Sequence, residues 1–423
     1  MLANLKIIFF FLLLLGGQAC QDSTQRMPIG LSESDTASSE EANSSKSDAG
    51  PSAIQPGAHQ LEVYLPQLEG KRIGMVVNQT STLGNQHLVD TLLSHEVQIL
   101  RIFAPEHGFR GTADAGEKVA DGKDTRTGLP LVSLYGKKKQ PDAKDLADID
   151  LMLFDIQDVG ARFYTYISTM HYVMEACAKH QIPLLILDRP NPNGHYVDGP
   201  VLLPTHQSFV GMHSVPIVHG MTIAEYARMI NGEGWLTDEQ VCDLSWVSCD
   251  QYDHQQFYQL PIKPSPNLPN ARSIYLYPSL CLFEGTTVSV GRGTTTQFQV
   301  YGHPDAKTGD HRFQPQPMEG AKYPKHEGKV CHGVDLSQEA LPKLQLTQLN
   351  LSYLLDFYRD FPNKDAFFLE NGFFDKLAGG PELRQQIMAN ADEMTIRNSW
   401  QAALTDFKAI RKKYLLYKDF AER

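Results

Sequence analysis

The sequence has little cysteine for its length and no surplus of basic residues. Six cysteines are spread over 423 residues, with neither the spacing of a zinc site nor the density of a disulfide framework. The net charge of -11 argues against a nucleic-acid partner, because neutralising phosphates requires clustered Lys and Arg. These shortages exclude zinc ribbons, small disulfide-rich domains and nucleic-acid binders.

Several catalytic motifs are also missing. No G-x-G-x-x-G follows the first predicted strand, and no G-x-S-x-G occurs. The segment "HEGKVCH" (326–332) has Val330 where a zinc protease would have its second ligand. No closely spaced set with an acid is formed by His107, His171, His213 and His219. We therefore expect no metal and no other cofactor.

One apolar run, "IIFFFLLLL" (7–15), follows Lys6 and is too short to span a membrane. Small residues then lead to Cys20, so residues 1–20 resemble a bacterial lipoprotein signal peptide in which Cys20 becomes lipidated. An ordinary signal peptide is the alternative, because Gly17 stands where a leucine is usual. Residues 21–57 are rich in Ser, Asp and Glu and predict a disordered tether. We expect an exported, membrane-anchored lipoprotein facing the periplasm, with the lipid as its only membrane contact.

The chain from residue 58 has the pattern of an α/β protein. Short, nearly continuous apolar runs predict strands buried in a parallel sheet, at 71–78, 97–104, 129–136, 149–156 and 182–189. Segments of helical length lie between them, at 86–96 and 164–180. A doubly wound, Rossmann-like sheet follows, in which ligands bind at the carboxyl ends of the strands.

Polar, Gly- and Pro-stiffened segments follow four of these predicted strands. They are "NQTS" (78–81), "PEHGFRG" (105–111), "DIQDVGARFYTY" (155–166) and "DRPNPNG" (188–194). Acids, amides, tyrosines and arginines in one place suit a neutral or anionic polar ligand such as a sugar. All four segments are expected to face one cleft.

At this point the sequence resembles the exo-β-N-acetylmuramidase family, formerly a domain of unknown function. The resemblance runs from about residue 60 to "KYLLY" (413–417), and it rests on "FAPEHGFRG" (103–111), "DIQDVGARFYTY" (155–166), "LDRPNPNG" (187–194), "YPSLCLFEGT" (277–286) and "GRGTT" (291–295). It implies a Rossmann-like catalytic domain, a smaller C-terminal α/β domain and an active site between them. We place the domains at 58–235 and 236–423, with helices at 221–236, 351–361 and 399–417.

The resemblance makes Glu106 of "PEHG" the leading candidate for the catalytic acid that protonates the leaving oxygen. Pro105 and Gly108 on either side of the Glu106-His107 pair would fix its aim. A helix-capping or salt-bridged glutamate is the structural alternative. For the second catalytic group we favour Tyr164 or Asp158. Asp155, Asp188 and Glu284 are also available, although Asp155 is as well explained by anchoring its loop.

Muramic acid differs from other amino sugars by its lactyl carboxylate, for which arginine is the preferred partner. Arg162 and Arg189 are slightly favoured for this role, although arginines beside acids also form structural pairs. The full set of expected substrate-binding residues is Asn78, His107, Arg110, Arg162, Arg189, Asn191, Glu284 and Arg292. "NPNG" is equally a plain turn signal, so Asn191 has a structural alternative.

The resemblance therefore implies a glycoside hydrolase that releases terminal β-linked N-acetylmuramic acid from peptidoglycan fragments during cell-wall turnover. Two alternatives remain open. One is a non-catalytic lipoprotein that binds such fragments, and the other is an exo-glycosidase that acts on another amino sugar. Nothing in the sequence indicates an oligomeric state.

Overall fold

The computed structural model describes residues 53–106, 108–109, 121–307 and 309–421. The expected signal peptide with Cys20, most of the expected tether, His107 and Arg110 lie outside these residues. Gln55 exchanges backbone hydrogen bonds of 3.0 and 2.8 Å with Asp250, and the Gly57 amide donates to Asp188 at 2.8 Å. Residues 53–57, which the sequence assigns to the tether, are therefore paired with the fold. Among the described residues, no helix is long and apolar enough to cross a membrane.

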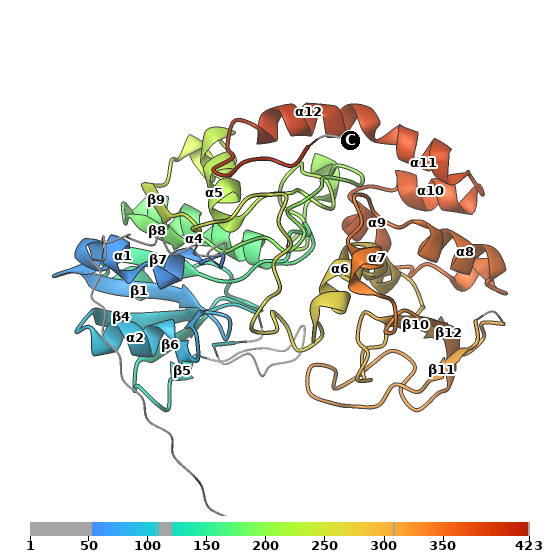
Figure 1. Ribbon diagram of the computed structural model, residues 1–423, viewed down its shortest axis with the longest axis horizontal. Helices are drawn as coiled ribbons and strands as arrows, with labels where there is room; N and C mark the ends of the chain where they lie inside the picture. Colours follow the sequence, from blue (N-terminus) through green and yellow to red (C-terminus); the bar gives the residue numbers. More distant parts are fainter. Residues whose placement is uncertain (1–52, 107, 110–120, 308, 422–423) are drawn as a thin grey trace, which may run out of the picture. The chain divides into compact units, whose positions relative to one another are not determined.

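A seven-stranded sheet is formed by strands between residues 72 and 247 (Figure 1). Its order is β5-β6-β4-β1-β7-β8-β9, and only β5 runs antiparallel to its neighbour. The strands are β1 (Arg72–Val77), β4 (Gln98–Ala104), β5 (Gly122–Lys123), β6 (Pro130–Ser133), β7 (Leu151–Asp155), β8 (Leu184–Leu187) and β9 (Leu244–Val247). All five predicted strands are confirmed. The chain order reverses between β1 and β7, which is where such sheets bind ligands.

Helices cover both faces of this sheet because its strands are apolar on both sides. Ile73, Met75 and Val77 of β1 pack in one cluster with α1 (Leu61–Leu68) and α2 (Leu88–Ser94). Val76 belongs to the other cluster. That second cluster includes residues of α3 (Ala143–Leu146), α4 (Tyr166–His180) and α5 (Ile223–Gly232). The sheet extends past residue 235, where the sequence places the domain boundary, since β9 pairs with β8.

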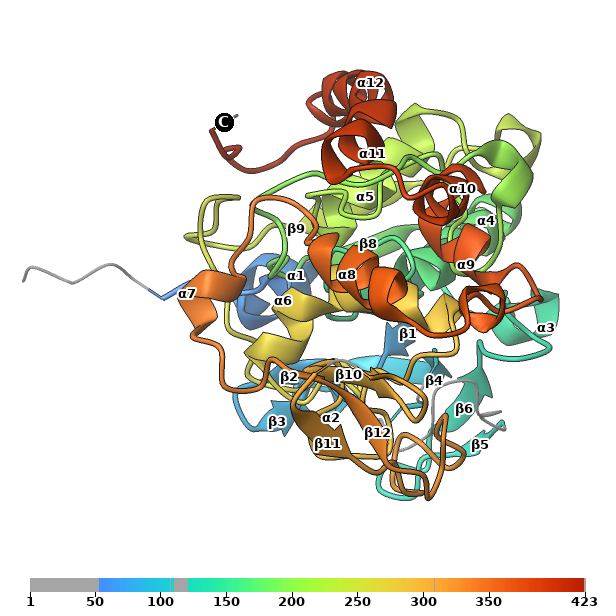
Figure 2. The same cartoon turned by 90° about the vertical axis from the view of Figure 1, so that its right-hand side faces the viewer.

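The rest of the chain holds a small antiparallel sheet and most of the helices (Figure 2). The small sheet has the order β10-β12-β11, from β10 (Val300–His303), β11 (His311–Phe313) and β12 (Cys331–Asp335). The helices are α6 (Ala271–Leu280), α7 (Leu341–Leu344), α8 (Ser352–Asp360), α9 (Phe373–Ala378), α10 (Glu382–Met388), α11 (Glu393–Ser399) and α12 (Gln401–Arg411). Earlier in the chain, between β1 and α2, the strands β2 (Thr82–Leu83) and β3 (Gln86–His87) form a two-stranded hairpin. Short 3-10 helices include Cys281–Gly285, between α6 and the small sheet.

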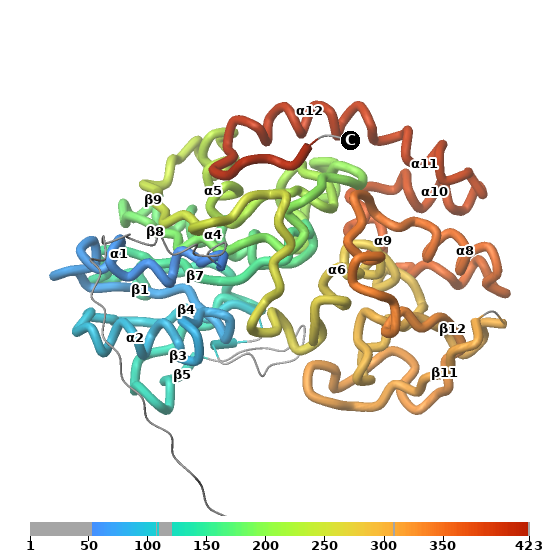
Figure 3. Tube along the Cα trace, in the orientation of Figure 1, coloured from blue at the N-terminus to red at the C-terminus, as the bar shows by residue number. Residues whose placement is uncertain are grey.

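The expectation of one helix over 399–417 is wrong beyond Arg411. The chain leaves α12 there and returns along α5 (Figure 3). The amide of Leu416 donates to Glu225 Oε1 at 2.8 Å, and the Tyr417 hydroxyl donates to Asp188 Oδ2 at 2.6 Å. These buried carboxylates accept the backbone and hydroxyl donors of the tail, which outweighs the helical periodicity of its apolar residues.

Candidate functional site

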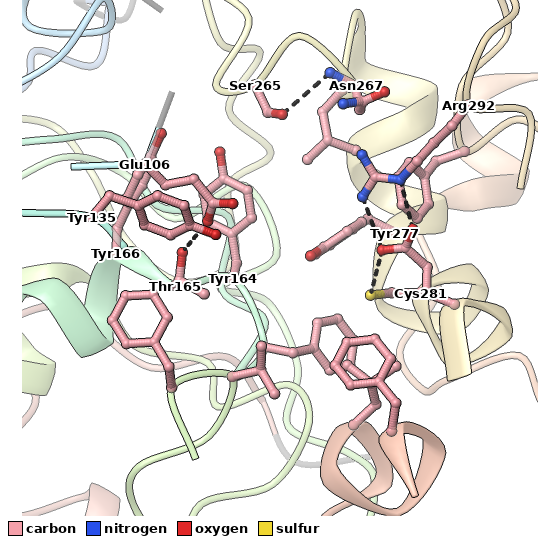
Figure 4. Close-up of a pocket in the computed structure, with 18 residues that line it drawn as sticks. Glu106, Tyr135, Tyr164, Thr165, Tyr166, Ser265, Asn267, Tyr277, Cys281 and Arg292 are labelled. Carbon is pink, nitrogen blue, oxygen red and sulfur yellow. Dashed lines mark hydrogen bonds and ion pairs between the residues drawn. The ribbon is translucent and has the colours of Figure 1, made fainter. Parts of the chain in front are cut away.

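A cavity of about 330 Å³ lies where residues from both halves of the chain meet (Figure 4). Its size falls in the range of small-molecule sites. Among the residues that the structure describes, the charged side chains that line it are Glu106, Glu284 and Arg292. The remaining lining is aromatic, apolar or polar, and consists of Tyr135, Phe163, Tyr164, Thr165, Tyr166, Phe209, Val210, Ser265, Asn267, Leu268, Tyr277, Cys281, Phe298, Phe373 and Leu377. Acids among aromatic rings and hydroxyls are suited to a sugar.

Glu106 stands on the turn that follows β4, next to the point where the strand order reverses. The Gly108 amide donates to the Pro105 carbonyl at 3.0 Å, and Gly108 has a φ of 75° that other residues adopt with strain. The Thr165 hydroxyl donates to Glu106 Oε2 at 2.8 Å, and Figure 4 shows Tyr135 beside them. Its place after β4 and the hydrogen bond from Thr165 therefore direct the half-buried carboxyl group into the cavity.

Glu284 and Arg292 form a bidentate pair on the opposite wall, with Nε to Oε1 at 2.6 Å and a second nitrogen to Oε2 at 2.9 Å. Arg292 also lies over the Phe298 ring, 5.0 Å from its centroid. Burial acts to raise the pKa of Glu284, but the charge and hydrogen bonds of Arg292, together with the charge of Lys325, outweigh burial and hold that pKa below its usual value. The cavity therefore has an ionised carboxylate facing the wall that carries Glu106.

Lys325 fixes the backbone that carries Glu284. Its ammonium group donates to the carbonyls of Phe283, Glu284 and Thr286 at 3.3, 3.0 and 2.6 Å. Burial lowers the pKa of Lys325 to about 8. The Cys281–Gly285 helix exposes these carbonyls at its end, and the buried ammonium satisfies them in place of water.

Three tyrosines form the floor between these walls. The Tyr164 ring packs edge-on against Tyr166 and Tyr277, at centroid distances of 4.9 and 5.8 Å. The Tyr164 hydroxyl donates to the Pro264 carbonyl at 2.7 Å. Burial raises the pKa of Tyr164 well above its ordinary value. The hydroxyl therefore stays protonated and serves as a hydrogen-bonding group in this arrangement.

Asp158, the other favoured candidate for the second catalytic group, is buried outside the lining of the cavity. The Gly160 amide donates to its Oδ2 at 2.6 Å, and Oδ1 has no hydrogen-bond partner within the described part of the chain. His219 Nε2 lies 4.0 Å from Oδ2. Burial raises the pKa of Asp158 to about 7 and lowers that of His219 to about 3. The side chain orders the loop that leads to Tyr164.

The raised pKa of Asp158 predicts a pH-dependent stability. A carboxyl group titrates near 3.9 in an unfolded chain. Between about pH 4 and pH 7 the folded protein therefore holds a proton that the unfolded chain has released, and this stabilisation is lost as the pH rises through about 7. In the parent, this group should lower the free energy of unfolding by up to about 1.4 kcal/mol for each pH unit of that rise. We expect Asp158→Asn to lack this pH dependence.

Urea unfolding at pH 5, 6, 7 and 8 measures this contribution. Relative to the parent, Asp158→Asn should become more stable as the pH rises from 5 to 7, and the difference in the free energy of unfolding should then level off. The exposed carboxylate of Asp238 supplies the control, and Asp238→Asn should differ from the parent by a constant amount. A constant difference for Asp158→Asn as well would contradict the prediction.

The two arginines favoured for the lactyl group are engaged elsewhere. The Arg162 guanidinium donates to the carbonyls of Pro200, Val215 and Leu377 at 2.8, 2.6 and 2.8 Å. Arg189 forms a buried bidentate pair with Asp155, at 2.5 and 2.8 Å. Neither lines the cavity.

The two amides also serve the backbone. Asn78 Oδ1 accepts from the Thr80 amide at 2.9 Å. The Asn191 amide group donates to the Met221 carbonyl at 2.9 Å, and its Oδ1 accepts from the Asn193 amide at 2.8 Å. Both amides are buried turn-forming groups that do not line the cavity. The structural alternative for "NPNG" matches this geometry.

Of the site residues expected from the sequence, the cavity brings together Glu106, Tyr164, Glu284 and Arg292. Thr165, Asn267 and Phe209 also line the cavity, and the sequence did not point to them. Thr165 lies within the quoted "FYTY", next to Tyr164, so its motif carried a signal. Asn267 comes from a Pro-rich loop, and no repeat or motif marks that loop. Among the described residues, no cluster of three His, Cys, Asp or Glu side chains is arranged to hold a metal.

Comparison with known proteins adds to this geometry. Two family models match consecutive parts of the chain, "Exo-beta-N-acetylmuramidase NamZ, N-terminal" at residues 73–272 and "Exo-beta-N-acetylmuramidase NamZ, C-terminal" at residues 275–417. The chain is 38% identical over 401 residues to the peptidoglycan beta-N-acetylmuramidase NamZ of Bacillus subtilis, covering 90% of this chain and 96% of that protein.

Two solved structures of DUF1343 family proteins from Bacteroides fragilis are also similar. One is 46% identical with a TM-score of 0.81, and covers 87% of this chain and 100% of its own. The other is 29% identical with a TM-score of 0.73, and covers 86% of this chain and 99% of its own.

Proposed function

The chain belongs to the exo-beta-N-acetylmuramidase NamZ family of glycoside hydrolases, and from this we propose that the cavity between Glu106 and the Glu284-Arg292 pair is its active site. The observation that carries the proposal is the placement of two carboxyl groups on opposite walls of one sugar-sized cavity. The Rossmann-like sheet supplies Glu106 on the turn after β4, which neighbours β1 at the point of strand reversal, and the C-terminal part supplies Glu284. Each half thus contributes one of the two acids that glycoside cleavage uses.

Glu106 is the general acid in this mechanism. It gives its proton to the glycosidic oxygen while the sugar ring develops oxocarbenium character. The Thr165 hydroxyl holds the carboxyl group in one orientation throughout. Glu284 is the second carboxylate, because it is ionised and faces the same cavity. Tyr164 then acts as a positioning residue on the floor, with its hydroxyl fixed on the Pro264 carbonyl.

The substrate is a peptidoglycan fragment that ends in β-linked N-acetylmuramic acid, and the products serve cell-wall turnover. Support for this substrate comes from the name of the Bacillus subtilis relative and from the family description, and the role in turnover follows from the product being a cell-wall sugar. We further propose that Cys20 is lipidated and holds the enzyme at a membrane on the periplasmic side. The apolar run at 7–15 and the polar segment 21–52 support this location.

Incubation of the full chain with the disaccharide of N-acetylmuramic acid and N-acetylglucosamine tests the function. We expect free N-acetylmuramic acid to appear, and no cleavage of the matching disaccharide of two N-acetylglucosamine units. Binding of the first disaccharide without cleavage would make the protein a non-catalytic binding lipoprotein. Equal cleavage of both disaccharides would make it an exo-glycosidase of broader specificity.

A further inference from the structure

The described cavity lacks an uncommitted cation for an anionic sugar. Its charged lining consists of two carboxyl groups and Arg292, whose guanidinium is already paired with Glu284. The lactyl group of the substrate in the proposed function adds a further negative charge. A pocket that selects this sugar needs a positive group at its wall. Of the arginines that the sequence pointed to, Arg110 lies outside the described residues, and the guanidinium groups of Arg162 and Arg189 bind backbone carbonyls and Asp155.

We propose that Lys139 binds the lactyl carboxylate. Its ammonium nitrogen lies 4.3 Å from the centroid of the Phe209 ring, and Phe209 lines the cavity. Tyr135, four residues earlier in the chain, lines the same wall, with its ring centroid 6.1 Å from that of Phe209. Tyr172 stacks on Phe209 at 6.3 Å and holds that ring in place. The ammonium group therefore lies against a ring of the cavity wall, and Lys139 itself stands next to the lining residues and not among them.

The charges around Lys139 distinguish it from its neighbours in the run of three lysines. Lys138 is paired with Asp142 and Asp145, at 3.0 and 2.5 Å. Lys137 is exposed. Lys139 is partly buried, and no carboxylate of the described residues pairs with its ammonium group. A half-buried cation that is held by a ring gains more from an arriving carboxylate than an ion-paired one does.

Recognition by Lys139 would favour the free acid over derivatives in which the lactyl group is an amide. An amide has the same shape near the carbonyl carbon but no charge, so it loses the ion pair and keeps the other contacts. A stem peptide attached to the lactyl group makes such an amide. The inference rests on the proposed function, and it deepens it by assigning the specificity for peptide-free muramic acid to one side chain.

The test compares two substrates on the full chain. These are the 4-nitrophenyl β-glycoside of N-acetylmuramic acid and the same compound with its lactyl carboxyl group converted to the methylamide. A hydrogen bond to a charged group is worth about tenfold or more. We expect Lys139→Met to lower kcat/KM for the acid by about tenfold or more and to leave the methylamide within about twofold. Lys139→Arg should keep the preference for the acid, and Lys137→Met is the matched control.

Equal losses on the two substrates would show that Lys139 only supports the wall and would overturn the proposal. An unchanged preference in Lys139→Met would overturn it as well, and would assign the carboxylate to another cation. Failure of the parent to cleave either glycoside would instead count against the proposed function. Thermal unfolding of each variant, followed by circular dichroism, identifies a loss that comes from misfolding, and Lys139→Arg then decides the question through its preference for the acid.

Discussion

Replacement of Glu106 by Gln is expected to lower kcat for the release of N-acetylmuramic acid from the disaccharide by about 10²- to 10⁴-fold, the usual contribution of a general acid. Gln keeps the shape of the side chain and accepts the same hydrogen bond from the Thr165 hydroxyl, so the turn after β4 stays in place. What it lacks is a transferable proton. Single-turnover measurement of the bond-breaking step follows this loss directly.

The leaving group separates proton donation from other roles of Glu106. The leaving group of a 2,4-dinitrophenyl glycoside is a stable phenolate, which departs without being protonated. Glu106→Gln should therefore cleave this glycoside within about tenfold of the parent rate. Glu62→Gln, an exposed glutamate on α1, is the matched control and should match the parent on both substrates. Equal losses of Glu106→Gln on the two substrates would mean that Glu106 is not the acid.

The sheet could be predicted from the sequence because its strands are buried on both faces and therefore read as continuous apolar runs. The strand β9 escaped this pattern, since it lies at the edge of the sheet and reads "LSWV" with alternating exposure. The small sheet was missed for a similar reason, as β10 and β12 are short and contain Gly and His. Apolar runs identify strands that are buried on both faces and miss short or partly exposed strands, whether they lie at an edge or, like β12, in the middle of a small sheet.

The acids of the site could be predicted better than its cations. Glu106 and Glu284 lie in quoted motifs, and both face the cavity. An arginine gives no sign in the sequence of which partner it has, because the partner is usually distant along the chain. Arg162 reaches the Leu377 carbonyl across 215 positions, and such a contact is visible only in the fold. Lys139 carried no motif, and its position on Phe209 is likewise a product of the tertiary structure.

Replacement of Glu284 by Gln should lower kcat by about 10²- to 10⁴-fold, if it is the second carboxylate that the reaction requires. The ionised side chain stabilises the oxocarbenium-like ring or attacks it, directly or through a water molecule, and Gln does none of these. Because Arg292 holds the pKa of Glu284 low despite burial, the parent should keep its rate into mildly acidic solution. The acidic limb of the pH profile of kcat should be absent from Glu284→Gln.

Loss of the bidentate pair must be separated from loss of the catalytic charge. Arg384 pairs with Asp375 at 2.8 Å through both carboxylate oxygens, outside the lining of the cavity, so Asp375→Asn breaks an equivalent pair. That variant should keep kcat within about tenfold of the parent. Glu284→Ala with added azide gives a second readout, because a small anion in the vacated space attacks the anomeric carbon and forms a glycosyl azide. Rescue of the activity by azide would show that the charge of Glu284 acts at the reacting centre. If azide gives no rescue and Asp375→Asn loses as much kcat as Glu284→Gln does, Glu284 is only a structural partner of Arg292.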